Sequence, residues 1–128
     1  LVVTNPEVSA VRDADRIIGL VEAEEKGPIK LIINRVNPAL TKRGDMLTPE
    51  DVIELLAIEL IGVIPDDENV VISTNRGQPV ALEPKSKSGQ AFKNIAKRLH
   101  GEKVPFSTID DKGDFLAKFA GIFKQGGD

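Results

Sequence analysis

Two mostly continuous apolar runs constrain the fold of this chain more than any other feature. Residues 29–34 read Ile-Lys-Leu-Ile-Ile-Asn, and residues 60–64 read Leu-Ile-Gly-Val-Ile. Short runs rich in β-branched residues predict strands, and because polar residues do not alternate with the apolar ones, both faces of each strand are expected to be buried. Strands of this kind occur in parallel sheets that helices cover on both sides.

Segments with helical spacing alternate with these strands. Residues 1–4 predict a further strand, which ends at Asn5-Pro6, and apolar residues then recur at helical spacing over residues 8–23. A second helix is predicted to begin after Thr48, a good N-cap residue with Pro49 in the first turn, and to reach about residue 57. The alternation predicts an α/β fold with right-handed crossovers.

The secondary-structure patterns in the remaining segments are weaker. We expect a long polar loop over residues 35–47, a short helix over 70–75 and a short strand over 80–82. A last body helix over residues 88–100 has an expected inward face of Ala91, Phe92, Ile95, Ala96 and Leu99. These elements amount to about half of a doubly wound domain. Because the chain also opens inside a predicted strand, we expect it to be the C-terminal part of a longer protein.

The end of the chain is amphipathic. At helical spacing the apolar side chains form one stripe with a lysine on each flank: Phe115, Leu116, Phe119, Ile122 and Phe123, flanked by Lys118 and Lys124. The apolar run has about a dozen residues, fewer than the roughly 20 that are needed to cross a bilayer. We therefore expect a helix that lies at a membrane surface. A terminal helix packed on its own domain is the alternative.

Composition and missing motifs exclude several functions. A net charge of -3 argues against a generally nucleic-acid-binding surface, and the absence of cysteine suits a reducing cytoplasm. Neither G-x-x-x-x-G-K-[ST] nor G-x-G-x-x-G occurs, so these residues have no motif that cradles a triphosphate. His100 lies at a helix end, and the side chains of three consecutive acids, residues 66–68, diverge. We therefore expect neither a catalytic residue nor a metal site.

Two predicted strand ends carry polar side chains that suit a ligand. Asn34 and Arg35 follow one buried strand, and Pro65, Asp66 and Asp67 follow the next. In doubly wound folds, ligands bind at the carboxyl ends of the strands. An Asn amide can pair with an adenine edge, and an Arg guanidinium can stack on a purine. Simple loop capping is the alternative role for each group.

Several motifs, in this order, resemble one family. Residues 4–16 (TNPEVSAVRDADR), 32–35 (IINR), 43–47 (RGDML) and 62–67 (GVIPDD) are similar to the C-terminal half of the MinD family of division-site ATPases, which are deviant Walker-type P-loop proteins. The resemblance covers residues 1–124. It implies that residues 1–104 are the C-terminal part of a P-loop ATPase domain, 105–113 a linker and 114–125 a membrane-targeting helix. It also implies that the phosphate loop lies in an N-terminal half that this chain lacks, so the chain alone should be inactive.

The resemblance further implies a function. The intact protein would bind ATP and Mg²⁺ and form a nucleotide-dependent homodimer. It would be a cytoplasmic protein that binds the anionic inner face of the cell membrane peripherally. It would position the division septum. Asn34, Arg35 and residues 65–67 would meet the adenine. A division inhibitor and a topological regulator would bind the helix over residues 8–23, whose candidate contacts are Ser9, Asp13, Asp15, Arg16 and Leu20.

Helical spacing gives that partner face independent support. Ser9, Asp13 and Arg16 lie within roughly 60° of one another, opposite the apolar stripe, and Leu20 lies on the same polar side. Asp15 points nearer the buried edge. A merely solvated helix face is the alternative.

Two other functions stay open. The first is a chromosome- or plasmid-partition ATPase of the same superfamily, in which a basic patch would contact DNA: Lys85, Lys87, Lys93, Lys97 and Arg98. The apolar tail favours a membrane over nucleic acid, because binding to DNA requires charge rather than exposed phenylalanines. The second is a membrane-binding or scaffold module without enzymatic activity.

Overall fold

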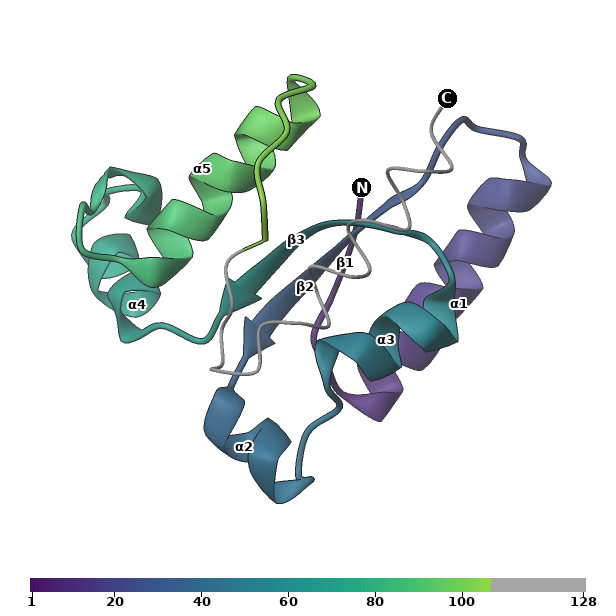
Figure 1. Ribbon diagram of the computed structural model, residues 1–128, viewed down its shortest axis with the longest axis horizontal. Helices are drawn as coiled ribbons and strands as arrows, with labels where there is room; N and C mark the ends of the chain where they lie inside the picture. The colour runs from purple at the N-terminus through teal and green to yellow at the C-terminus, as the bar shows by residue number, and fades with distance from the viewer. Residues whose placement is uncertain (107–128) are drawn as a thin grey trace.

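The computed structural model describes residues 1–106 of the chain. Three strands, β1 (Val2–Thr4), β2 (Lys30–Val36) and β3 (Glu59–Pro65), form a parallel sheet in the order β1-β2-β3 (Figure 1). Val3 pairs with Ile32, and Leu31 pairs with Leu60. The strands predicted over residues 1–4, 29–34 and 60–64 and their parallel arrangement are confirmed.

Helices cover both faces of the sheet. On one face, α1 (Val8–Ala23) and α3 (Pro49–Leu56) enclose a core that includes the fully buried Leu31 and Ile33. On the other face, α5 (Lys87–Leu99) packs its Ile95 against Ile32, Ile61 and Ile64. Neighbouring residues of β2 thus enter opposite cores, which explains why the run is apolar without alternation.

The predicted loop over residues 35–47 is wrong, because it contains the short helix α2 (Pro38–Arg43). The Asn37 side chain accepts hydrogen bonds from the amides of Ala39 and Leu40, Pro38 occupies the first turn, and Gly44 ends the helix at a left-handed φ of 78°. Start and stop signals were therefore present. Six residues are too few for helical periodicity to show.

The segment after β3 also differs in part. A short helix, α4 (Glu68–Asn75), agrees with the prediction over residues 70–75. The predicted strand over residues 80–82 is wrong: Val80–Leu82 is a 3-10 turn, η1, in which the Leu82 amide donates to the Pro79 carbonyl. Pro79, the residue before this turn, has its own φ fixed by its ring at -64°, and three apolar residues alone cannot distinguish a turn from a strand.

The inward face of α5 is narrower than predicted. Ile95 is buried and Ala91 is partly buried, but Ala96 is exposed, and Phe92 and Leu99 are 41% and 51% exposed. Within residues 1–106, α5 packs mainly on β3 and η1, so only one side of the helix is covered. In the same part of the chain, no helix is long and apolar enough to cross a membrane. The predicted membrane residues Phe115 to Lys124 lie outside the described residues.

Candidate functional site

The ends of β2 and β3 bring four of the predicted base-binding residues together. Val36 pairs with Pro65 in the sheet, and the Asp66 amide donates a 2.9 Å hydrogen bond to the Val36 carbonyl. Arg35 Nε lies 3.7 Å from Asp66 Oδ1. Asn34 is half-buried within β2 beside Arg35. Residues that are about thirty positions apart therefore share one edge of the sheet.

Arg35 has an unusual backbone. Its φ of 57° lies in the left-handed region, and the strand register is irregular between Ile33 and Val36. A non-glycine residue in this region costs about 1–2 kcal/mol relative to an extended conformation. The Arg35 side chain is 66% exposed and that of Asp66 is 45% exposed. Because exposed ion pairs are weak, the guanidinium remains available to a ligand.

Asp67 has a different environment from its neighbour Asp66. Its Oδ2 accepts from Ser86 Oγ at 2.7 Å and from the Ser88 hydroxyl and amide at 3.0 and 3.1 Å. Its Oδ1 accepts from the amide and side-chain nitrogens of Asn69 at 2.9 and 2.8 Å. Desolvation raises the pKa of Asp67, but the hydrogen bonds from Ser86, Asn69 and Ser88 outweigh it and hold the pKa well below its usual range. Both oxygens are thus occupied by donors of the chain itself.

Ser86 and Ser88 also belong to this edge, and no sequence motif pointed to them. Ser86 caps α5 by accepting from the Gly89 amide, and both hydroxyls are almost completely buried. The run Lys-Ser-Lys-Ser-Gly before an amphipathic helix does signal an N-cap. No local signal joins these serines to Asp67, which lies 19 and 21 residues away.

The predicted partner face of α1 is open to solvent. Ser9, Asp13, Asp15, Arg16 and Leu20 are all exposed. Arg16 Nη1 lies 4.0 Å from Asp13 Oδ1, and Leu20 is 64% exposed. Asp15 is exposed, although helical spacing places it nearer the buried edge. Two further apolar side chains on the same helix, Val8 and Ile17, are more than half exposed, so the exposed apolar surface of α1 is larger than its sequence indicated.

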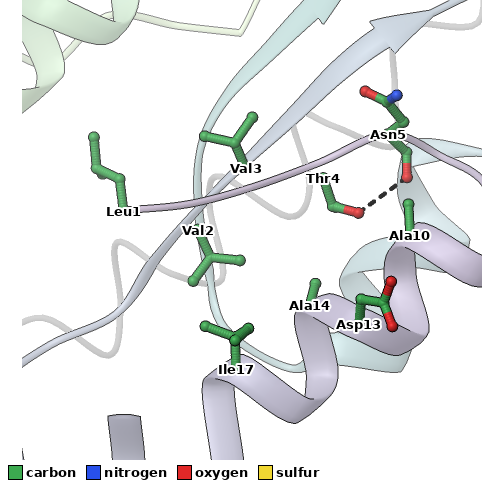
Figure 2. A pocket seen from close by; sticks show the side chains of 9 residues that line it. All are labelled: Leu1, Val2, Val3, Thr4, Asn5, Ala10, Asp13, Ala14 and Ile17. Carbon is green, nitrogen blue, oxygen red and sulfur yellow. Dashed lines mark hydrogen bonds between the residues drawn. The ribbon is translucent and has the colours of Figure 1, made fainter. Parts of the chain in front are cut away.

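A groove runs between α1 and the outer edge of β1 (Figure 2). Its volume is about 470 Å³, and its lining includes Val2, Val3, Asp13 and Ile17. Within the described residues, β1 pairs only with β2, so the backbone on the groove side has no partner strand. An unpaired edge beside an apolar groove has the geometry that accepts another strand.

The polar and apolar groups at the ends of β2 and β3 suit the base of a nucleotide. The edge formed by Asn34, Arg35, Pro65 and Asp66 offers an amide, a guanidinium and a proline ring, which fit the edge and face of a base. Among residues 1–106, no group of three or more His, Cys, Asp or Glu side chains could hold a metal ion. Chemically, these groups can hydrogen-bond to a planar ligand and stack on its face.

Comparison with known proteins places this geometry in context. No family model matches the chain. It is 53% identical over 107 residues to the septum site-determining protein MinD of Synechocystis sp., an alignment that covers 83% of this chain and 40% of that protein. The MinC:MinD cell division protein complex of Aquifex aeolicus superposes with a TM-score of 0.79 at 46% identity, over 83% of this chain and 44% of that one.

A third relative was solved with a nucleotide. The septum site-determining protein MinD of Pyrococcus horikoshii, complexed with Mg-ADP, superposes with a TM-score of 0.66 at 25% identity, over 90% of this chain and 42% of that one. The chain spans less than half the length of each of these relatives. The sequence and fold together show that the chain belongs, over the portion that it spans, to the MinD family of septum site-determining proteins.

Proposed function

We propose that this chain is the C-terminal portion of a membrane-associated ATPase that positions the bacterial division septum. In this proposal residues 1–104 complete a P-loop ATPase domain, residues 105–113 form a linker and residues 114–125 form a membrane-targeting helix. The groove along the outer edge of β1 is where the rest of that domain would continue the sheet. The identity to MinD proteins over less than half of their length supports the first part of this proposal, that the chain is one portion of such a protein.

The chain's part in nucleotide binding would be the adenine site. The observation that carries this proposal is the pairing of Arg35 with Asp66 across the carboxyl ends of β2 and β3. The Asn34 amide can hydrogen-bond the base edge, and the Arg35 guanidinium can stack on the base face. Pro65 would provide an apolar surface, and Asp66 would orient Arg35.

ATP with Mg²⁺ supplies the phosphoanhydride bond that such an enzyme hydrolyses. Nothing in this sequence resembles a phosphate-binding loop, so the groups that hold the phosphates and the metal would lie in the preceding half of the protein. The relative solved with Mg-ADP supports this choice of nucleotide. Hydrolysis is therefore proposed for the full-length protein only.

The proposed partners are a membrane, other proteins and a second copy of the enzyme. An ATP-dependent homodimer would carry two apolar tails, which bind an anionic inner membrane more strongly together than singly. The exposed face of α1 would receive a division inhibitor and a topological regulator through Ser9, Asp13, Asp15, Arg16 and Leu20. The Aquifex relative was solved in complex with MinC, which supports the first of these partners.

The base site is tested by replacing Arg35→Ala in the full-length protein and measuring the dissociation constants of ATP and of tripolyphosphate, which has no base. A guanidinium stacked on an aromatic ring is worth about 0.5–2 kcal/mol, so ATP should bind about 2- to 30-fold more weakly while tripolyphosphate binding is unaffected. Arg43→Ala removes another exposed arginine, paired with Asp45, and serves as the control. Equal weakening of both ligands, or of neither, would show that Arg35 does not contact the base.

A further inference from the structure

Asp67 joins three elements at the candidate base site. It follows β3, it caps the N-terminus of α4 through the Asn69 amide, and it binds Ser86 and Ser88 at the start of α5. We propose that Asp67 is a positioning residue, which fastens the loop of residues 65–67 to α5 and thereby fixes Asp66 against Arg35. This inference rests on the proposed adenine site.

The loop is held from two sides. On the side of β2, the Asp66 amide donates to the Val36 carbonyl. On the side of α5, the carboxylate of Asp67 accepts from the hydroxyls of Ser86 and Ser88 and from the Ser88 amide. Hydrogen bonds to a charged acceptor are stronger than bonds between neutral groups. Asp67 is therefore the stronger of the two tethers, and the position of Asp66 depends on it.

The two serines that bind Asp67 are themselves held in place. Ser86 and Ser88 are 3% and 0% exposed, and Ser86 Oγ also accepts from the Gly89 amide within α5. The helix is fixed to β3 at its other end, because Arg98 Nη1 donates to the Ile61 carbonyl at 2.9 Å. A hydroxyl pair buried on a fixed helix can hold a carboxylate in one place. The loop thus takes its position from the sheet and from α5 together.

The sharpest test removes the negative charge of Asp67 and keeps the shape of its side chain. In Asp67→Asn, an NH2 group takes the place of Oδ2, which now accepts three hydrogen bonds. This group cannot accept, and its hydrogens face the Ser88 N–H. In the full-length protein, ATP and tripolyphosphate are titrated separately. We expect the dissociation constant of ATP to rise about tenfold while that of tripolyphosphate changes less than about twofold. A purely structural defect would weaken both ligands alike.

Two further variants make the result decisive. Asp51→Asn is the matched control, since Asp51 also accepts an amide hydrogen bond at a helix start, from Thr48 at 2.9 Å, but on α3. It should leave both dissociation constants within about twofold of the parent. Ser88→Ala keeps the carboxylate and removes one buried donor, so it should weaken ATP alone, by about threefold, and this variant answers the question if Asp67→Asn does not fold.

Each other outcome overturns the proposal. If Asp67→Asn and Ser88→Ala bind ATP like the parent while Arg35→Ala binds it weakly, the base site stands but Asp67 does not position it. If Arg35→Ala binds ATP normally as well, both the base site and its positioning are wrong. Equal weakening of ATP and tripolyphosphate by Asp67→Asn would assign Asp67 to general stability.

Discussion

Two neighbouring carboxylates at the end of β3 have opposite environments. Asp66 is half-exposed and pairs loosely with Arg35, whereas Asp67 is saturated by donors from α4 and α5. Their sequence positions predicted that both would lie at a ligand-binding strand end, because the strand ends at Pro65. Nothing local distinguishes the two, since the serines that bind Asp67 lie 19 and 21 residues further along the chain.

The depressed pKa of Asp67 predicts a dependence of stability on pH. The hydrogen bonds favour the charged form, so the carboxylate stabilises the fold above its ordinary pKa of 3.8 and loses this effect as the pH falls below that value. In urea titrations of the full-length protein, Asp67→Asn should be less stable by about 2 kcal/mol at pH 7. The gap should shrink as the pH approaches 3.

The control for this prediction is Asp45→Asn, because the exposed carboxylate of Asp45 pairs with the exposed Arg43. It should match the parent at both pH values. A gap for Asp67→Asn that is constant with pH would mean that the variant loses packing rather than a charged acceptor.

At the scale of elements, the strength of each sequence signal decided what could be predicted. Continuous apolar runs identified β2 and β3, and Thr48 with Pro49 identified the start of α3, where the structure shows a complete capping box. The short elements α2 and η1 are too brief for periodicity. The exposure of Phe92 and Leu99 on α5 could not be predicted, because it depends on which other elements cover the helix.

The packing of α5 on β3 depends on Gly62. A Cβ at this position would overlap the side chain of Ile95, so Gly62→Ala should destabilise the full-length protein by about 1–3 kcal/mol in chemical denaturation. In an Ile95→Ala background the obstructing atoms are gone, and the same change should cost less than about 1 kcal/mol. Equal costs in both backgrounds would place the constraint in the backbone of β3 instead.

The exposed face of α1 predicts a loss of regulation without a loss of basal activity. Asp13 makes only a long, exposed ion pair with Arg16, so Asp13→Ala should change stability by less than about 0.5 kcal/mol. In the full-length protein it should weaken regulator-stimulated ATP hydrolysis and leave the basal rate unchanged. Glu102→Ala, at an exposed position after α5, should change neither rate. Equal losses of the basal and stimulated rates would indicate a structural role for Asp13.

At the scale of the whole molecule, the described residues form a three-stranded sheet in which the β1 edge has no partner strand among them. The sequence offers few strands for a doubly wound domain and no phosphate loop, so it predicts that a preceding half completes the sheet. The geometry of the groove beside β1 could not be predicted, since it depends on how α1 crosses the sheet.

The tail predicts membrane attachment that depends on nucleotide. A single amphipathic segment of about a dozen residues binds weakly, whereas two on an ATP dimer gain from effective concentration. Phe119→Glu should abolish co-sedimentation of the ATP-bound full-length protein with anionic liposomes and spare ATP binding. Ala117→Glu adds the same charge opposite the apolar stripe and should retain binding. Intact binding by Phe119→Glu, with a lowered melting temperature, would make the tail a core helix.

The most direct test of the account compares ATP binding by this chain alone with binding by the full-length protein, using isothermal titration with Mg²⁺. In the proposed division of the nucleotide site, the base is recognised by this chain and the phosphates are held by the preceding half. This division predicts a dissociation constant in the micromolar range for the full-length protein and no measurable binding by the chain alone. Micromolar binding of ATP by residues 1–128 alone would contradict it.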